Sequence, residues 1–199
     1  MIKSFITAFI LGIFSLTTFA QAAEDEPYTF SPPGCEFEVT FPTEPAIQKR
    51  CPPTAKAGCY DVATFSKVYD YNATISFEIS CNLITKELRD AYDQAAIEAL
   101  LSGAAKRKGM ETKPKLFFEE PEKDGKTYKI GAVSGLKKSA ANSHLFIYQI
   151  WRGDQSIMLI DAEMSESSHL DADQTFASII SSIRITESKD TENDTKDAE

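Results

Sequence analysis

Four cysteines are the residues of this chain whose chemistry is easiest to interpret. Cys35, Cys51, Cys59 and Cys81 form an even set, and an oxidising compartment lets such a set pair as disulfides. A zinc site would need a Cys-x-x-Cys pair or nearby histidines, and the spacings match no common zinc finger. We therefore expect two structural disulfides, and no redox-catalytic or metal-binding role.

Four cysteines allow three pairings, and hairpin geometry favours one of them. Cross-strand partners lie symmetrically about a turn, so a turn centred on Thr43 places Cys35 opposite Cys51, and a later turn places Cys59 opposite Cys81. The alternative is the nested pairing of Cys35 with Cys81 and Cys51 with Cys59. Either pairing staples a β-meander and stabilises it by about 2–4 kcal/mol per bond.

The histidines and their neighbouring carboxylates could bind a metal or act in catalysis. His169, Asp171 and Asp173 have ligand side chains, but acidic residues at a helix start are ordinary partners of the helix dipole. His144 could be a general base, yet no Gly-x-Ser-x-Gly nucleophile elbow accompanies it. We predict no catalytic residue, no cofactor and no metal site.

A basic segment stands out in an otherwise acidic chain. Lys106, Arg107, Lys108, Lys113 and Lys115 could form a positive face for an acidic partner or a lipid headgroup. Lysines at helix ends and on edge strands also discourage aggregation of sheets. We favour this second interpretation and keep the five residues as a candidate interaction patch.

Length and charge limit the classes of protein to consider. The chain has 199 residues, with 21 Lys and Arg against 30 Asp and Glu, and a net charge of -9. This composition is typical of one globular domain, and the negative charge argues against a general binder of nucleic acid or of anionic membranes.

The N-terminal segment resembles a secretory signal peptide. Residues 5–19 are mostly apolar, and Ala20-Gln21-Ala22 offers the small residues that a signal peptidase reads. The run falls short of the about 20 apolar residues that span a bilayer. We predict a signal peptide at 1–22, cleavage near Ala22-Ala23, no stable membrane anchor, and a periplasmic or secreted protein.

The rest of the chain divides into a body and a tail. We expect a single domain over residues 23–186. Residues 187–199 contain six acidic residues and no large apolar one, so we expect an acidic disordered tail.

Hydrophobic periodicity predicts the elements of the body. Two-residue alternation predicts strands at 35–41 and 73–81, and further apolar runs between turn signals predict strands at 63–69, 115–119, 127–136, 144–151 and 156–164. Helical spacing predicts one helix from the N-cap Thr85 to near Gly109, with a stripe that includes Leu88 and Leu100, and a second helix that begins near Leu170. We predict turns at Asp124-Gly125 and at 152–155, where Arg-Gly-Asp copies an adhesion tripeptide but suits a hairpin.

The strand at 144–151 is apolar on both faces and therefore needs cover on both. The second helix, with the stripe Ala172, Phe176, Ile179, Ile180 and Ile183, can supply part of it. The order β-β-β-α-β-β-β-β-α predicts an α+β fold, an antiparallel sheet of about six to seven strands with helices packed on it.

The element order, the opening Cys-Glu-Phe-Glu-Val-Thr-Phe-Pro at 35–42 and the closing segment 172–183 resemble the Mog1/PsbP-like superfamily, including its small exported bacterial members of unknown function. The resemblance implies an α/β/α sandwich and non-enzymatic roles, such as an extrinsic photosystem subunit or a small-GTPase partner. The stretch from Cys51 to Cys59 and the signal peptide depart from those branches, so neither specific role is carried over.

Two hypotheses about function follow. The first is an exported, non-enzymatic accessory or protein-interaction module with an unknown protein partner and no nucleic acid. The alternative is a small-molecule-binding protein or hydrolase with a pocket between helix and sheet, lined by Tyr148 or Trp151. The oligomeric state stays open.

Overall fold

A computed structural model describes residues 26–52, 58–110, 115–138, 143–165 and 169–186. Its strands are β1 (Tyr28–Phe30), β2 (Phe37–Phe41), β3 (Ala46–Arg50), β4 (Tyr60–Tyr69), β5 (Ala73–Leu83), β6 (Lys115–Glu119), β7 (Glu122–Lys123), β8 (Lys126–Thr127), β9 (Lys129–Lys138), β10 (Ser143–Arg152), β11 (Ser156–Ser165) and β12 (Arg184–Ile185). Its helices are α1 (Lys86–Ala91), α2 (Gln94–Arg107) and α3 (Leu170–Ser182). The expected signal peptide, the acidic tail and Lys113 lie outside the described residues.

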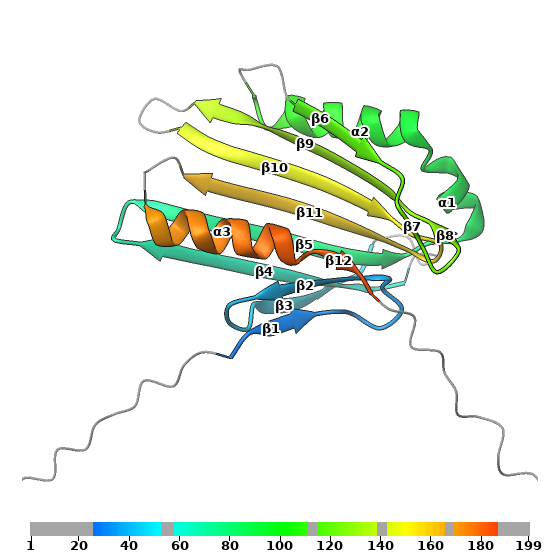
Figure 1. The fold of residues 1–199 in the computed structure, drawn as a ribbon, viewed down its shortest axis with the longest axis horizontal. Coiled ribbons are helices and arrows are strands. Elements are labelled where there is room, and N and C mark those ends of the chain that lie inside the picture. The colour runs from blue at the N-terminus through cyan, green and yellow to red at the C-terminus, as the bar shows by residue number, and fades with distance from the viewer. Residues whose placement is uncertain (1–25, 53–57, 111–114, 139–142, 166–168, 187–199) are drawn as a thin grey trace, which may run out of the picture.

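The centre of the molecule is an antiparallel sheet of seven strands in the order β3-β4-β5-β11-β10-β9-β6 (Figure 1). Six of these strands are among those that the sequence predicts, and the seventh is β3, which it does not predict. The α+β class with a sheet of six to seven strands is therefore confirmed.

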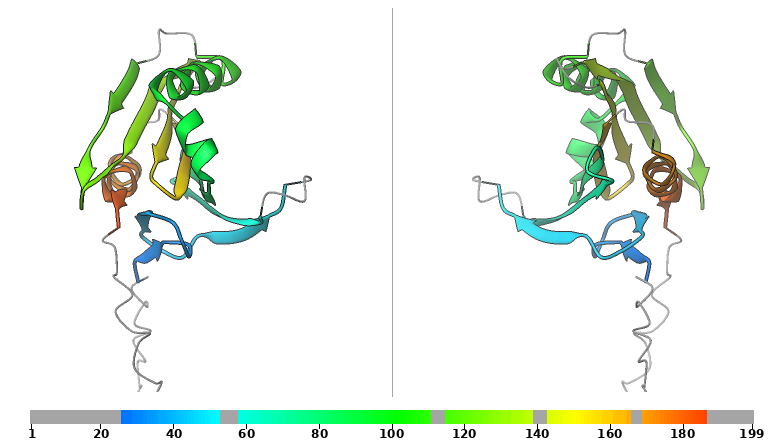
Figure 2. Two further views of the ribbon diagram at one scale, coloured as in Figure 1. Left: turned by 90° about the vertical axis from the view of Figure 1, so that its right-hand side faces the viewer. Right: turned by 90° about the vertical axis from the view of Figure 1, so that its left-hand side faces the viewer.

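The sheet is covered on both faces, as the pattern of β10 predicts. Phe146 and Ile150 of β10 belong to a core cluster with α2, whereas Leu145, Ile147 and Trp151 pack against the cluster that contains α3. Figure 2 shows the two helices on opposite sides of the sheet. The result is a three-layer sandwich with one hydrophobic core on each face of the sheet.

Helices α2 and α3 pack on the sheet through different contacts. In α3 the predicted residues Phe176 and Ile179 are buried, and the Phe176 ring lies 5.0 Å from the ring of Phe77 in β5. α2 packs closely on β9, where a Cβ on Gly131 would overlap the side chain of Ile97. Glycine at position 131 therefore lets the helix pack directly on the strand.

The predicted single helix from Thr85 to near Gly109 is two helices. Thr85 is an N-cap as expected, accepting the N–H of Leu88 at 3.3 Å. A second N-cap, Asp93, accepts the N–H of Ala96 at 2.8 Å and starts α2. The predicted apolar stripe is wrong in phase, because α2 buries Ile97, Leu101, Ala104 and Ala105. None of the described helices is long and apolar enough to cross a membrane.

A second, three-stranded sheet has β2 between β1 and β12. Phe37, Val39 and Phe41 of β2 are fully buried in the cluster beneath α3. The alternating pattern of this segment correctly predicts a strand, but the strand lies outside the main sheet (Figure 1).

The favoured disulfide pairing is wrong, and the nested alternative is the observed one. Cys35 is bonded to Cys81 and Cys51 to Cys59. The prediction required β2 to pair with the segment that contains Cys51. Instead β2 pairs with β1 and β12, so no turn centred on Thr43 brings Cys35 opposite Cys51.

The register of β3 and β4 explains the second bond. Arg50 lies opposite Tyr60, and the next step along both strands places Cys51 opposite Cys59. In the β4–β5 hairpin the residue opposite Cys81 is Asp61 and not Cys59. The turn there is centred one residue later than the expected Asp70, which shifts every cross-strand partner by two positions.

Candidate functional site

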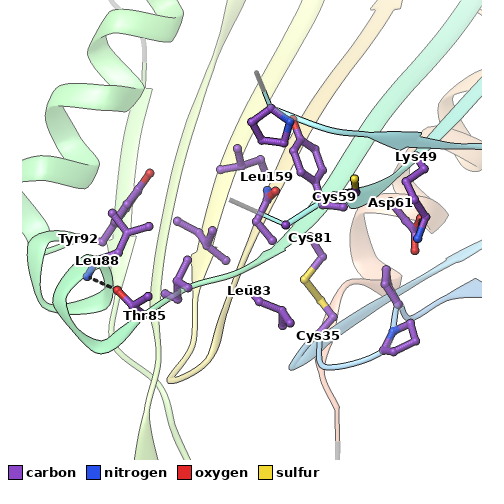
Figure 3. Close-up of a pocket in the computed structure, with 18 residues that line it drawn as sticks. Cys35, Lys49, Cys59, Asp61, Cys81, Leu83, Thr85, Leu88, Tyr92 and Leu159 are labelled. Atoms are coloured by element: carbon purple, nitrogen blue, oxygen red, sulfur yellow. Dashed lines mark hydrogen bonds and ion pairs between the residues drawn. A yellow bond between two sulfur atoms is a disulfide. The ribbon is translucent and has the colours of Figure 1, made fainter. Parts of the chain in front are cut away.

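An open groove of about 640 Å³ lies at the end of the main sheet next to α1 (Figure 3). It is bordered by the loop before β2, by the ends of β3 and β4 and by the segment from β5 into α1, with β11 contributing two residues. Its lining residues are Pro32, Pro33, Cys35, Lys49, Pro52, Gly58, Cys59, Tyr60, Asp61, Cys81, Asn82, Leu83, Ile84, Thr85, Leu88, Tyr92, Ile157 and Leu159.

The α1 side of the groove presents apolar side chains to solvent. Leu83, at the end of β5, is 68% exposed and Leu88, in α1, is 45% exposed. Leucine side chains are usually buried, so exposed leucines that gather around one concave surface are informative. Leu83 and Leu88 thus add exposed apolar surface to a groove whose floor includes the core residues Cys81 and Ile157.

Polar contacts hold α1 in place, because this helix buries none of its side chains. The N–H of Ile84 donates to the carbonyl of Gln155 at 2.9 Å, which fixes the connection between β5 and α1. Arg89 of α1 pairs with Asp154 in the β10–β11 turn at 3.4 Å. The apolar residues of the segment are therefore left to line the groove.

The opposite side of the groove is built from β3, β4 and the disulfides. The ammonium of Lys49 lies 3.4 Å from a carboxylate oxygen of Asp61. In Figure 3, Cys59, Lys49 and Asp61 lie across the groove from Thr85, Leu88 and Tyr92. The groove thus combines apolar contact area with a few polar groups, and its volume is in the range of ligand sites, about 300–1,000 Å³.

The lining residues define the chemistry that the groove offers. The side chains that the structure places there include neither histidine nor serine, and the cysteines among them are bonded in disulfides. In the described part of the chain, no group of three His, Cys, Asp or Glu residues could hold a metal ion. The groups that line the groove are apolar side chains, the Lys49–Asp61 ion pair and a few hydroxyl groups.

Tyr148 and Trp151, which the sequence suggests as pocket residues, do not line this groove. Trp151 packs edge-on against Phe37, at 5.8 Å between ring centroids, and its indole N–H donates to Oε1 of the Gln149 side chain at 2.8 Å. Tyr148 is stacked on Phe146, and burial raises the pKa of its hydroxyl group. Both rings belong to the packing of β10 and not to the groove.

Sequence reasoning missed the groove because its apolar residues look like core residues. Leu88 and Tyr92 have the spacing of a buried stripe. A usable signal was present in Asp93, a strong N-cap residue inside the predicted helix. A break at that position separates Leu88 and Tyr92 from the helix that packs on the sheet.

The candidate basic patch is only partly assembled. Lys106 and Arg107 are exposed in the last turn of α2, where cations suit the helix dipole. Lys115 is exposed at the start of β6. Lys113 is outside the described residues, and Lys108 has a different environment.

Lys108 binds two carboxylates of the neighbouring strand. Its ammonium lies 3.0 Å from Asp161 and 2.7 Å from Glu163 of β11, and 4.7 Å from the ring centroid of Phe146. Burial lowers the pKa of Lys108, but the hydrogen bonds to Glu163 and Asp161 outweigh it and the pKa is raised. Burial raises the pKa of Asp161 by more than Lys108 lowers it. Lys108 therefore joins α2 to the sheet.

The two histidines occupy structural positions. Nδ1 of His169 accepts the N–H of Ala172 at 3.3 Å and caps α3, and Nε2 lies 3.0 Å from a carboxylate oxygen of Asp70. His144 is half-buried on β10, opposite Ser165 of β11. The Ser165 hydroxyl accepts the N–H of Thr74 at 2.7 Å.

The Arg-Gly-Asp segment forms the β10–β11 turn, as predicted. Arg152 is only 9% exposed, and a Cβ on Gly153 would overlap a carboxylate oxygen of Glu36. The tripeptide is thus enclosed by its surroundings and does not project as an adhesion loop.

The fold and the groove together describe a three-layer α/β/α sandwich with an apolar groove at one end of its sheet. No protein-family model and no curated protein matches the chain. Among solved structures, it is similar to PsbP (CyanoP) from the cyanobacterium Synechocystis, at 11% identity and a TM-score of 0.46, covering 86% of this chain and 99% of that one.

A second similar structure is LpqN of Mycobacterium tuberculosis, which is described as involved in cell envelope biogenesis. The identity is 12% and the TM-score 0.35, with 84% of this chain and 88% of that chain covered. At these identities and TM-scores, we transfer no role from either protein.

Proposed function

We propose that the chain is an exported, non-enzymatic accessory module that acts by binding, and that the groove next to α1 is its binding surface. The occupant that we propose is an apolar segment of a partner protein. Leu83 and Leu88 would contact the apolar side chains of that segment, and the Lys49–Asp61 pair would face its polar edge.

The observation that carries the proposal is the exposure of Leu83 and Leu88 on a framework that is otherwise held rigidly. Exposed apolar side chains gathered around one concave surface mark sites of interaction. The disulfide between Cys35 and Cys81 ties the loop before β2 to β5 beside the groove. A fixed surface pays a smaller entropic cost on binding.

The proposed export is supported by the cysteines. All four are paired, and disulfides persist mainly in oxidising compartments. The apolar segment at 5–19 and the small residues at 20–22 are the sequence features of an exported protein.

A small apolar molecule is the second candidate occupant, favoured by the groove volume of about 640 Å³. The neutral dye Nile red serves as a probe for both candidates, because it reports an accessible apolar site by its fluorescence. We expect the oxidised protein to bind the dye, and the L83D/L88D double variant to lose most of that binding.

The matched control places the same changes elsewhere. Leu170 is 70% exposed and Leu100 is 42% exposed, close to the values of Leu83 and Leu88, and neither lines the groove. The L170D/L100D variant should therefore bind Nile red as the unmodified protein does. Equal loss in both double variants would show that the dye does not report the groove, and would contradict the proposal.

A further inference from the structure

The two disulfides differ in their access to solvent. Cys51 and Cys59 are both exposed, whereas Cys81 is only 6% exposed and Cys35 is half-buried. Thiol–disulfide exchange requires a thiolate to reach one of the two sulfur atoms. On exposure alone, the Cys51–Cys59 bond is open to attack in the folded protein and the Cys35–Cys81 bond is shielded.

The surroundings of the two bonds differ in the same direction. Cys81 lies in β5, which is flanked by β4 and β11, and it is part of the core cluster beneath α3. Cys51 follows β3, an edge strand whose five residues are all exposed. Cys35 and Cys81 line the groove, but one is half-buried and the other only 6% exposed, so a thiolate has less access to their sulfur atoms than to those of Cys51 and Cys59.

Few interactions hold β3 apart from its pairing with β4. Arg50 forms two hydrogen bonds to Glu78 of β5, at 2.6 and 2.8 Å, and Lys49 pairs with Asp61. These ion pairs are exposed, and such pairs stabilise a structure only weakly. The Cys51–Cys59 bond continues the β3–β4 pairing by one step and is the covalent restraint on this edge strand.

We propose that the Cys51–Cys59 disulfide is a site of thiol–disulfide exchange for a dithiol reductant, at which the protein is reduced while Cys35–Cys81 stays oxidised. A thiolate of the reductant attacks one sulfur, the Cys51–Cys59 bond breaks, and the other cysteine leaves as a thiolate that takes up a proton. The second thiol of the reductant then attacks the mixed disulfide. It closes the disulfide of the reductant and releases the second cysteine. The protein disulfide gains the two electrons and two protons that the dithiol loses.

The exchange has a consequence for the groove, and this part rests on the proposed function. Pro52, Gly58 and Cys59 line the groove next to the bond. Reduction leaves β3 held by its ladder and by exposed ion pairs only. The side of the groove that faces α1 then loses its covalent restraint, and binding there becomes weaker in the half-reduced protein.

The exchange itself is tested on the full-length oxidised protein without any binding partner. Dithiothreitol is added under native conditions, the reaction is stopped with N-ethylmaleimide at increasing times, and alkylated cysteines are located by peptide mass mapping. We expect Cys51 and Cys59 to be alkylated about tenfold faster than Cys35 and Cys81, or more. Equal rates, or faster reduction of Cys35–Cys81, would overturn the proposal.

A C51S/C59S double variant is the control for the shielded bond. In this variant, Cys35–Cys81 should be reduced as slowly as in the unmodified protein, because its protection comes from its own burial. If it is reduced as fast as Cys51–Cys59 normally is, then no stable half-reduced form exists and the proposal fails.

Two further measurements distinguish a failure of this inference from a failure of the proposed function. Amide hydrogen exchange of β3 (Ala46–Arg50) should accelerate in the half-reduced protein, whereas exchange of β11 (Ser156–Ser165) should stay the same. Unchanged exchange in β3 would show that the Cys51–Cys59 bond does not restrain this strand. Nile red binding is then compared between the oxidised and half-reduced forms. Selective reduction without any dye binding in either form would leave the exchange site standing and contradict only the groove.

Discussion

At the scale of single residues, Glu36 connects the two sheets. Its carboxylate accepts the N–H groups of Asp154, Gln155 and Ser156 and the hydroxyl of Ser156, at distances of 2.8 to 3.1 Å. The carboxylate fills the space beside Gly153, which explains why this position has no side chain. Glu36 thus fastens the start of β2 to the β10–β11 turn, beside the α1 end of the groove.

This arrangement predicts coupled effects of two substitutions. Glu36→Ala should lower the free energy of unfolding by about 2–3 kcal/mol, because several donors lose a charged acceptor. Gly153→Ala should have a similar cost, because its Cβ would displace the carboxylate. In the Glu36→Ala background, Gly153→Ala should cost much less, since the space is then free. Urea unfolding of the four proteins measures this, and strictly additive costs would contradict the predicted contact.

The sequence predicts residue roles correctly where the interacting groups are close together along the chain. Residue type correctly predicts the N-cap Thr85 and the turn at Asp124-Gly125. The two turn residues have left-handed φ angles of 53° and 71°. The role of Glu36 was not predictable, because its donors come from a turn 118 to 120 residues further along the chain. In the sequence, Glu36 looks only like the polar face of a strand.

At the scale of elements, Lys108 determines how the end of α2 sits on the sheet. Lys108→Met should lower the free energy of unfolding by about 1–3 kcal/mol at neutral pH, because Asp161 and Glu163 lose their shared cation. The matched control is Lys106→Met, at an exposed position two residues earlier, which should change stability by no more than about 0.5 kcal/mol. Urea unfolding gives both values, and equal effects would contradict the anchoring role.

The pH dependence of this contact has a definite sign. The pKa of Lys108 is raised above 10.5, so its contribution to stability is complete below pH 10.5 and is lost as the pH rises through the folded-state pKa. Without Lys108, the pKa of Asp161 should rise further in the folded protein. The cost of Lys108→Met should then shrink as the pH falls below about 4, because protonation of Asp161 removes a charge that Lys108 neutralises. A cost that is the same at pH 7 and at pH 3.5 would contradict this account.

Element type was easier to predict than element partners. Alternation identified β2, but it carries no information about which strand lies beside it, so the hairpin assumed for Cys35 and Cys51 was wrong. β3 was missed because all five of its residues are exposed and no buried face marks the strand. Cross-strand symmetry does describe Cys51–Cys59 once it is applied to the β3–β4 pair, in which Arg50 lies opposite Tyr60.

At the scale of the whole molecule, the sandwich follows from strands that need cover on both faces. The apolar residues on both sides of β10 correctly required two helical layers. The sequence could not show that α1 would leave Leu83 and Leu88 uncovered, because this depends on where the helix breaks and how its polar contacts hold it. The groove is therefore a property of the assembled fold.

The central claim is that the groove is the binding surface of an exported module, and site-specific photo-cross-linking tests it most directly. A photoreactive amino acid replaces Leu83 in one full-length protein and the equally exposed Leu170 in another, each expressed in the native host and recovered from its exported fraction. We predict a discrete cross-linked partner from position 83, identified by peptide mass mapping, that is absent from position 170 and lost on Leu88→Asp but kept in K106E/R107E. The same product from both positions, or its loss only in K106E/R107E, would contradict the claim.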